Sequence, residues 1–416
     1  MVNFNASIPK ILLTFLGNFN KSFSKPAFVS FCLYISGLFL SLKRTNIQSI
    51  SLFTPNSNYQ NLQYFLSEAK WNHEELNDIR TQLLQRNRTT KTSKSGVLAI
   101  DDSGCKKWGI KTEGAQIQHY GTEGTLTRCN IVVASAFCDN RKRYPVNFRP
   151  YVPENDSFFD KPFTKFKSKL ELAKELILDA VSKNLKFSDI VFDAWYLANH
   201  IIKFIQSLKL TFISNVPSDR LVSYHGKWIR AGELVKFIPV HKFNRTVTVS
   251  NANGELKSFY IYSFKGKLKD VKGDFLFVAS IGCWDNSDDS KSFHLFITNH
   301  LSLPPNQVIQ KYSLRWGIER IFRDLKDNLN FDHYQVRSIA AINRHWHLVA
   351  LAYSFLLICS FNGSFSRTFY QKPASCGIQL ELFRKLKSIS QLAWIKQNFQ
   401  HYQIYLGTKK PLRQAA

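Results

Sequence analysis

Two stripes of different character run along residues 312–326, which read YSLRWGIERIFRDLK. At about 100° per residue, the spacing of an α-helix, Tyr312, Arg315, Glu319 and Lys326 fall on one narrow polar strip. A second strip beside it is apolar and consists of Leu314, Ile318, Ile321, Phe322, Leu325 and Leu329. We therefore predict one continuous amphipathic helix that packs one side on a core and presents the neighbouring side to a partner.

The first 85 residues are predicted to be helical. Apolar residues recur at helical spacing in residues 59–65, and residues 72–75 resemble a capping box. The apolar stretch 27–42 is shorter than the roughly 18 residues that a membrane-spanning helix needs, so we expect a buried helix there. Residues 86–95, RNRTTKTSKS, lack apolar side chains and indicate a basic linker after this N-terminal domain of residues 1–85.

The pattern changes to short apolar runs after the linker. It predicts strands and helices in the order β-β-β-α-β-α-β, at residues 97–100, 129–137, 143–152, 163–186, 190–192, 197–207 and 211–214. This order is that of a ribonuclease H-like α/β core, and we assign residues 96–215 to its first part. Residues 304–335, which contain the two-striped segment, are expected to complete it.

Two aspartates follow predicted strands of this core. Asp101 ends the first strand and Asp193 ends the strand after the first helix, and these two strands lie side by side in this architecture. Neighbouring carboxylates repel each other unless a cation such as a divalent metal bridges them. Because side chains alternate along a strand, only one of Asp101 and Asp102 can point towards the metal. We favour Asp101 and retain Asp102 as the alternative.

About 125 residues separate Asp193 from Glu319, which is more than a minimal core requires. Residues 216–303 contain short β-like runs broken by Gly, Asn and Asp, and we predict a β-rich insertion there. Trp284 lies in its exposed-looking segment CWDN and could stack on an unpaired base or simply pack. Residues 336–416 are expected to form a C-terminal helical region.

The net charge of the chain indicates which class of molecule it binds. Lys and Arg total 56 against 30 Asp and Glu, which gives a net charge of +26 and favours a polyanion such as DNA, with the N-terminal domain as a DNA-binding module. The charge is spread along the chain and is not gathered on one amphipathic helix, which disfavours a membrane partner. Seven scattered cysteines without a C-x-x-C pair indicate a reducing cytoplasm and no structural zinc.

The polar strip of the two-striped segment has two readings. Arg and Lys clamp phosphate oxygens while a carboxylate binds a cation, so the strip suits a phosphate held beside a divalent metal. The alternative is a solvated helix with an ordinary ion pair between residues four positions apart.

These residues resemble the bacterial insertion-sequence transposases that have a ribonuclease H-like core and an Asp-Asp-Glu triad. Tyr312-x2-Arg315-x3-Glu319-x6-Lys326 is similar to the diagnostic helix of one branch, and Asp193-Ala194-x-Tyr196 is similar to its second motif. Residues 37–46, 65–71 and 101–104 resemble its double-aspartate-serine/threonine group.

The resemblance implies cut-and-paste DNA transposition by metal-dependent cleavage and strand transfer. Asp101, Asp193 and Glu319 would hold two Mg²⁺ ions, for which Mn²⁺ could substitute, while Tyr312, Arg315 and Lys326 would bind DNA. It also implies terminal inverted repeats and target DNA as partners, a homodimer in the active complex, and a location at the bacterial nucleoid. Two rivals stay open: another ribonuclease H-like nuclease, and an inactive DNA-binding relic.

Overall fold

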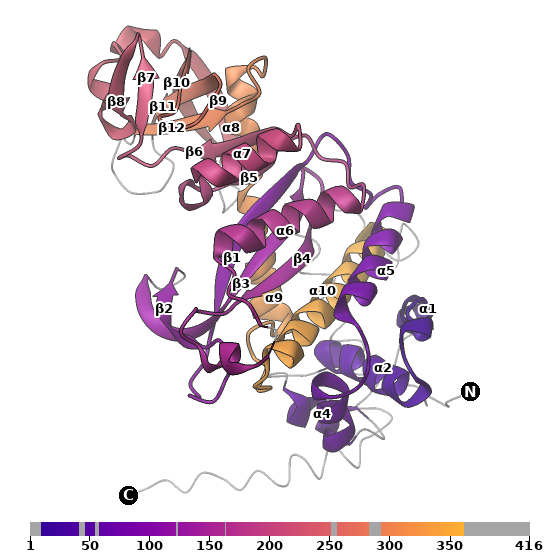
Figure 1. The fold of residues 1–416 in the computed structure, drawn as a ribbon. Coiled ribbons are helices and arrows are strands. Elements are labelled where there is room, and N and C mark those ends of the chain that lie inside the picture. Colours follow the sequence, from indigo (N-terminus) through magenta and orange to yellow (C-terminus); the bar gives the residue numbers. More distant parts are fainter. Residues whose placement is uncertain are drawn as a thin grey trace, which may run out of the picture. The chain divides into compact units, whose positions relative to one another are not determined.

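The computed structural model of the chain describes residues 10–40, 46–54, 58–121, 124–162, 164–250, 256–282 and 293–361. The chain separates into two compact units. The first combines Met1–Thr89 with Asp324–Ala416, and the second is Thr90–Arg323. Figure 1 labels the helices and strands of both.

One mixed sheet dominates the second unit. Its strands run in the order β2-β3-β1-β5-β6-β12-β11-β10-β9, and β4 pairs with β3 beside this path. Their bounds are β1 Val97–Lys106, β2 Gln116–Tyr120, β3 Thr125–Cys138, β4 Arg143–Tyr151, β5 Ile190–Phe192, β6 Phe212–Asn215, β9 Arg245–Ser250, β10 Leu256–Gly266, β11 Phe275–Ile281 and β12 Phe293–Thr298. A separate hairpin joins β7, Leu221–Tyr224, to β8, Lys227–Arg230. A mixed α/β fold with a large central sheet is consistent with the ribonuclease H-like fold expected from the sequence.

The neighbouring strands β1 and β5 position the two aspartates. They pair in parallel with Leu98 opposite Ile190 and Ala99 opposite Val191, as the strand order predicted. Continuing this register by two residues brings Asp101 level with Asp193. The prediction that β1 ends at residue 100 is wrong, because its pairing with β3 continues without interruption as far as Lys106.

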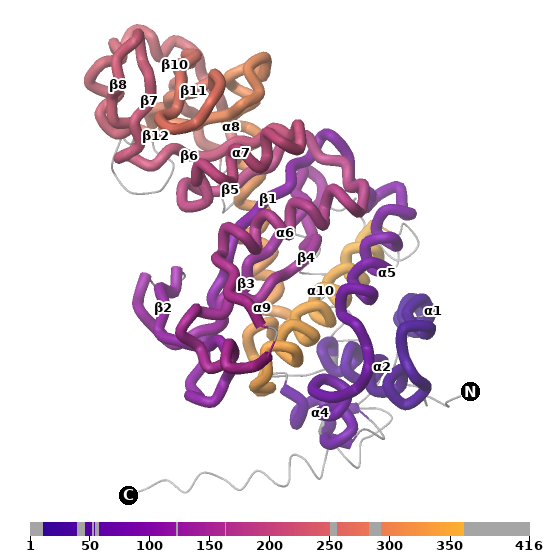
Figure 2. The backbone as a smooth tube through the Cα atoms, viewed as in Figure 1, coloured from indigo at the N-terminus to yellow at the C-terminus, as the bar shows by residue number. Residues whose placement is uncertain are grey.

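Three α-helices belong to the second unit. They are α6, Lys169–Ser182, α7, Asn199–Ser207, and α8, Pro305–Ser313, and the described part of this unit also includes the start of α9, Trp316–Leu329. Figures 1 and 2 show α6 and α7 on the near side of the sheet and α8 behind it. The helix predicted at residues 163–186 is shorter in the structure, because Ser168 and Glu171 form a capping box that starts α6 at Lys169. Phe163 itself lies outside the described residues.

The β-like runs predicted within residues 216–303 do form strands, but four of them enlarge the central sheet. Strand β12 pairs with β6 through Phe296 opposite Asn215 and Ile297 opposite Ser214, and β11, β10 and β9 follow in antiparallel order. The structure also contains β2 and β7, which the apolar pattern did not predict. The inserted segment therefore widens the sheet beyond β6.

The first unit is helical throughout its described residues. Its helices are α1 Lys10–Gly17, α2 Lys25–Leu40, α3 Ile47–Phe53, α4 Tyr59–Ser67, α5 His73–Arg86 and α10 Ile339–Phe361. Buried polar contacts join α10 to the N-terminal helices: the Tyr34 hydroxyl lies 2.7 Å from Nδ1 of His345, and Arg80 donates to Ser354 at 2.9 Å. None of the helices in the described ranges combines the length and apolarity of a bilayer span.

Candidate active site

The segment that carries the predicted polar strip forms two helices. Helix α8 ends at Ser313 and α9 spans Trp316–Leu329, with a turn between them. In this turn the backbone N–H of Arg315 donates to the carbonyl of Tyr312, and that of Ile318 donates to the carbonyl of Arg315, which is the tighter three-residue spacing. The prediction of one continuous helix is therefore wrong, and Tyr312 and Glu319 lie on different helices.

Gly317 allows this turn to lie close to the sheet. A Cβ atom built on Gly317 would be 2.6 Å from Sγ of Cys138, the last residue of β3, and 3.0 Å from its Cβ. Such contacts are well inside van der Waals distance, so only glycine fits without displacement of a neighbour. The close approach places the start of α9 against the strand that pairs with β1.

Arg315 joins two carboxylates that come from distant parts of the chain. One guanidinium nitrogen lies 3.1 Å from Oδ2 of Asp101 on β1, and the other lies 2.7 Å from Oε1 of Glu319 on α9. The side chains of Arg315 and Asp101 are only 12% and 16% exposed, whereas that of Glu319 is 42% exposed. A cation thus lies between a strand carboxylate and a helix carboxylate, with one of them open to solvent.

Asp193 completes a cluster of negative charge. Its carboxylate accepts hydrogen bonds from the backbone N–H groups of Trp195 at 3.0 Å and Tyr196 at 3.3 Å, so it also caps a short 3₁₀ turn. Burial raises the pKa of Asp193, and Arg315 opposes that rise. Asp193 therefore has the local capping role that its sequence context allows and also belongs to the cluster.

The pKa of Asp101 records how strongly these carboxylates interact. The pKa of Asp101 is raised to about 8 in all: burial raises it most, Arg315 lowers it, and the charges of Asp193, Asp102 and Glu319 raise it. A carboxylate with such a pKa releases its proton readily only when more positive charge arrives. The cluster is therefore short of positive charge even with Arg315 in place.

Asp102 has different partners. Lys169, in the first turn of α6, lies 2.9 Å from its Oδ2, and the Tyr196 hydroxyl donates to its Oδ1 at 2.9 Å. Because successive side chains of a strand point to opposite faces, Asp102 points towards α6 while Asp101 points towards Arg315 and Glu319. The geometry thus separates the two aspartates that the sequence left as alternatives.

Tyr312 lies beside Arg315 at the end of α8. Its ring packs edge to face on Phe296 with centroids 4.9 Å apart, and the guanidinium carbon of Arg315 lies 5.7 Å from the ring centroid. Burial raises the pKa of the Tyr312 hydroxyl, and Arg315 lowers it. Tyr312 is only 6% exposed, so the strip predicted to face a partner is largely enclosed here.

The two remaining predicted site residues are Lys326 and Trp284. Lys326 follows Glu319 by two turns on α9, a rise of about 10 Å along the helix axis. Trp284 lies outside the described residues. The structure therefore brings together Asp101, Asp193, Glu319, Arg315 and Tyr312, and leaves Lys326 further along the same helix.

The donor chemistry of the cluster fits a divalent metal. Carboxylates are hard oxygen ligands, and their mutual repulsion falls when a cation binds. As placed, no three His, Cys, Asp or Glu side chains in the described ranges surround a single point closely enough to ligate one ion. Arg315 accounts for this arrangement, because its guanidinium takes the position between Asp101 and Glu319.

Sequence reasoning missed two supports of this site. Lys169 holds Asp102, and the capping box at Ser168 and Glu171 was the signal that places Lys169 in a first helical turn. Lys311, on α8, lies 2.6 Å from Oδ2 of the fully buried Asp189 just before β5. This ion pair anchors α8 at Lys311, the residue before Tyr312. No local sequence pattern predicts the pair.

Comparisons with known proteins identify the family of the chain. The family described as DDE superfamily endonuclease matches residues 18–227, about half of the chain, and the family described as transposase DDE domain matches residues 161–355. A probable transposase for insertion sequence element IS701 from Microchaete diplosiphon is 23% identical over 332 residues, which cover 79% of this chain and 80% of the relative. Asp193 lies in both family matches, Asp101 in the first and Glu319 in the second.

Proposed function

The chain belongs to the DDE superfamily of endonucleases and is a DNA transposase, and we propose that Asp101, Asp193 and Glu319 are its catalytic carboxylates. The observation that carries this proposal is the contact of Arg315 with both Asp101 and Glu319, which are 218 positions apart in the sequence, at 3.1 and 2.7 Å. Asp193 is close enough to raise the pKa of Asp101. Asp102 is assigned to support of the site, through Lys169 and Tyr196.

The cofactor proposed for these carboxylates is Mg²⁺, in a two-ion site in which Mn²⁺ could substitute. Asp101, Asp193 and Glu319 would hold these ions, which would supply activation of the attacking oxygen and stabilisation of the leaving oxygen. Asp101 and Asp193 offer oxygens from adjacent strands, and the solvent-exposed Glu319 can rotate about its side-chain bonds to meet them. Binding requires Arg315 to release Asp101.

Arg315 and its neighbours are proposed to hold DNA. The guanidinium of Arg315, which contacts Asp101 and Glu319, would bind a phosphate of the DNA backbone in place of these carboxylates. Tyr312 packs against Arg315 and limits its movement, while Lys326 offers a second positive charge about two helical turns away. Together they fix the scissile phosphate in line for attack.

The proposed chemistry needs no covalent enzyme intermediate. In cleavage, a water oxygen forms a bond to phosphorus while the bond from phosphorus to the 3′ oxygen breaks, and that oxygen leaves as a 3′-hydroxyl. In strand transfer, this 3′-hydroxyl attacks a phosphodiester of target DNA, and a second 3′ oxygen leaves. Because two transposon ends must react together, we propose that a homodimer carries out the reaction on terminal inverted repeats.

The finer roles of the other segments are proposals of the same kind. The helices at residues 1–85 would bind the repeat, and the inserted residues 216–303, including Trp284, would hold the cleaved end. The basic charge of +26 supports extended contact with DNA beyond the active site.

The experiment that tests the function uses purified protein, Mg²⁺ and a duplex that carries the inverted repeat flanking the coding sequence. We expect strand cleavage at the repeat and joining of the new 3′-hydroxyl to a second DNA. Cleavage without joining would favour another ribonuclease H-like nuclease. DNA binding without cleavage in Mg²⁺ or Mn²⁺ would indicate an inactive relic.

A further inference from the structure

A two-stranded ribbon continues the catalytic strand outward. Beyond Asp101, β1 runs on to Lys106 opposite Cys129 of β3, and β2 then pairs with the next part of β3, with Ile117 opposite Arg128 and His119 opposite Leu126. Strand β2 is the edge of the central sheet at the end opposite to β9. Figure 2 shows this ribbon at the margin of its unit.

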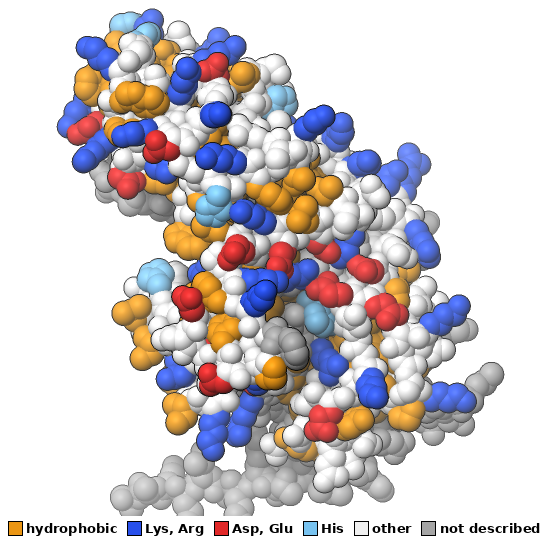
Figure 3. All heavy atoms as spheres, viewed as in Figure 1, with side chains coloured by type: hydrophobic (Ala, Val, Ile, Leu, Met, Phe, Trp, Pro, Cys, Tyr) orange, Lys and Arg blue, Asp and Glu red, His pale blue; other side chains and the backbone are white. Residues whose placement is uncertain are grey.

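One face of the ribbon exposes large apolar side chains. On the strands, Ile117 is 67% exposed and Leu126 74%; in the loop that leads from β1 to β2, Trp108 is 84% exposed and Ile110 78%. Leu126 is opposite His119, and paired residues share a face of the sheet. Ile117 is two positions from His119 on β2, so its side chain lies on the same face as that of Leu126. The opposite face buries Tyr120 and Cys129. Figure 3 shows hydrophobic side chains at the surface over β2. Apolar exposure of this kind marks an interaction site.

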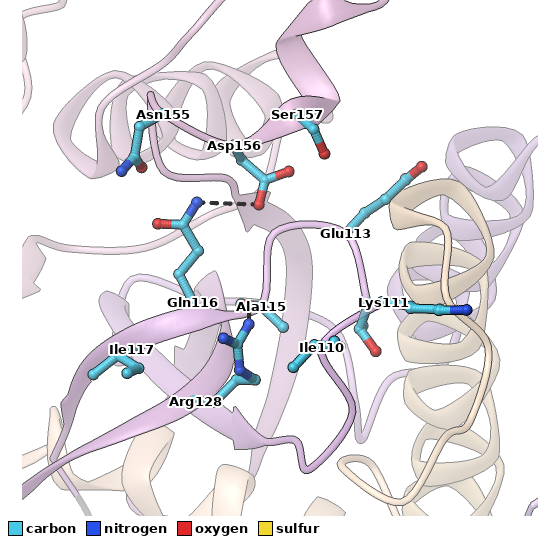
Figure 4. A pocket seen from close by; sticks show the side chains of 11 residues that line it. Ile110, Lys111, Glu113, Ala115, Gln116, Ile117, Arg128, Asn155, Asp156 and Ser157 are labelled. Carbon is cyan, nitrogen blue, oxygen red and sulfur yellow. Dashed lines mark hydrogen bonds between the residues drawn. The ribbon is translucent and has the colours of Figure 1, made fainter.

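An open pocket of about 530 Å³ lies at the base of this face. Ile110 and Ile117 line it together with Lys111, Thr112, Arg128 and the segment 155–157. In Figure 4, Arg128 lies between the two isoleucines, and Gln116 and Asp156 lie across the pocket from it. The pocket therefore combines two isoleucine side chains with mainly polar walls that include the guanidinium of Arg128.

Two acidic side chains line the pocket: Glu113 is held in an ion pair, whereas Asp156 keeps its negative charge. The carboxylate of Asp156 accepts hydrogen bonds from the backbone N–H groups of Gly114 and Phe158, and Glu113 forms an ion pair with Lys161. Arg128 donates through one nitrogen to the carbonyl of Ala115 at 2.6 Å, which holds its guanidinium in place. Lys111 and Arg128 outnumber the remaining carboxylate of Asp156, so the lining of the pocket carries a net positive charge.

We infer that the ribbon face, defined as Ile110, Lys111, Ile117, Leu126 and Arg128, binds duplex DNA. Lys111 and Arg128 contact backbone phosphates, and the apolar side chains lie against sugars and base edges in the minor groove. A second copy of the chain suits this face less well, because lysine is depleted in the centres of protein interfaces. This inference rests on the proposed function, since it assigns a new contact for the DNA on which the site acts.

The strand geometry also says where the contact falls. Asp101 and Lys106 lie five positions apart on β1, about 17 Å along an extended strand. At a rise of about 3.4 Å per base pair, that is about five base pairs from the scissile phosphate. The ribbon face begins at this distance and extends further along β2.

The test measures binding without cleavage. Wild-type protein and variants are titrated, in EDTA and at several salt concentrations, into a fluorescent duplex of about 30 base pairs that carries the inverted repeat, and anisotropy is recorded. Lys111→Glu should weaken binding about tenfold and lower the slope of log affinity against log salt by about 1. The apolar pair Ile110→Ser with Ile117→Ser should weaken binding severalfold at an unchanged slope.

Two controls match these changes elsewhere in the same unit. Lys186→Glu alters an exposed lysine before β5, at the strand end away from Asp193, and Leu178→Ser alters a 45% exposed leucine on α6. Both should bind DNA as wild type does. Hydroxyl-radical footprinting should show protection about five or more base pairs from the cut that the Lys111 and isoleucine variants lose.

Wild-type affinity and footprint in both ribbon variants would overturn the inference. So would unchanged DNA binding with a loss of self-association in sedimentation, since that result would assign the face to a second copy. A failure of the proposed function is separable, because it would show as no cleavage by wild type in Mg²⁺, whatever the ribbon variants do in EDTA.

Discussion

Arg315 donates a charge-assisted hydrogen bond to the carboxylate of Asp101 at 3.1 Å, across a separation of 214 residues in sequence. The same guanidinium reaches Glu319 at 2.7 Å. The protein's own cation therefore lies among the carboxylates that are proposed to bind metal. A metal ion and Arg315 should compete for them.

This competition predicts the response of Arg315→Ala to Mg²⁺. Without metal the variant should be less stable by about 2 kcal/mol or more, because mostly buried carboxylates lose their counter-charge. Mg²⁺ should then raise its melting temperature more than it raises that of wild type, since it has no arginine to displace. Arg323→Ala, an exposed change on the same helix, serves as the control. An equal or smaller Mg²⁺ response in Arg315→Ala would count against the competition.

Substitutions of Asp101 and Asp102 should reduce DNA cleavage to different extents. Asp101→Asn should reduce Mg²⁺-dependent cleavage on the order of 10³-fold or more, because it removes a proposed metal ligand. Asp102→Asn should reduce cleavage about tenfold, since it loosens Lys169 and Tyr196 without removing a ligand. Tyr196→Phe, which deletes only the hydroxyl that donates to Asp102, should behave like Asp102→Asn. Equal losses in the two aspartate variants would refute this division of roles.

The buried pair of Asp189 and Lys311 predicts a dependence of stability on pH. Burial alone would raise the pKa of Asp189, but hydrogen bonds from Lys311 and Thr211 outweigh it and lower the pKa below its usual value. A depressed folded-state pKa gives stability that is present above the unfolded value, near 4, and is lost as pH falls through the folded value.

Asp189→Asn should therefore lower the free energy of unfolding at pH 7 by about 3 kcal/mol. The difference from wild type should shrink as pH falls below about 4, where wild type loses the same contribution. Denaturant unfolding at a series of pH values measures both. A difference that stays constant down to pH 3 would show that the ion pair is not its source.

Gly317→Ala tests the close approach of the α8–α9 turn to β3. The added Cβ would meet Sγ of Cys138 at 2.6 Å, and we expect a destabilisation of about 1–3 kcal/mol. Cys138→Ala removes that sulfur but leaves the Cβ contact at 3.0 Å, so the double variant should recover part of the loss. Thermal unfolding of both single variants and the double variant gives the coupling energy. Strictly additive effects would mean that the clash is absent.

Local patterns in the sequence predicted the strands that position the aspartates. The run at residues 190–192 became β5 without change, and the strand order predicted its parallel pairing with β1. The assignment of β5 and its pairing with β1 were both predicted from short apolar runs that end at polar residues. Strand β2 was missed because QIQHY has few apolar residues and pairs only at an edge of the sheet.

Long-range contacts lay beyond such reasoning. A helical wheel places residues on one helix, and it could not show that a turn at Leu314 and Arg315 directs the guanidinium inward to Asp101. Nor does any local pattern pair β12 with β6 or Lys311 with Asp189. The candidate site residues, Arg315 among them, were thus proposed from the sequence, whereas the contact of Arg315 with Asp101 was not.

Glu319→Gln is the variant that tests the central claim most directly. It keeps the size of the side chain and removes the charge that is proposed to bind metal. Asp327→Asn makes the same chemical change at an exposed position of the same helix and is the control. Cleavage of a labelled repeat duplex in Mg²⁺ should fall on the order of 10³-fold or more in Glu319→Gln, with DNA affinity within about threefold of wild type, while Asp327→Asn keeps both. Cleavage by Glu319→Gln at a rate close to that of wild type would contradict the assignment of the active site.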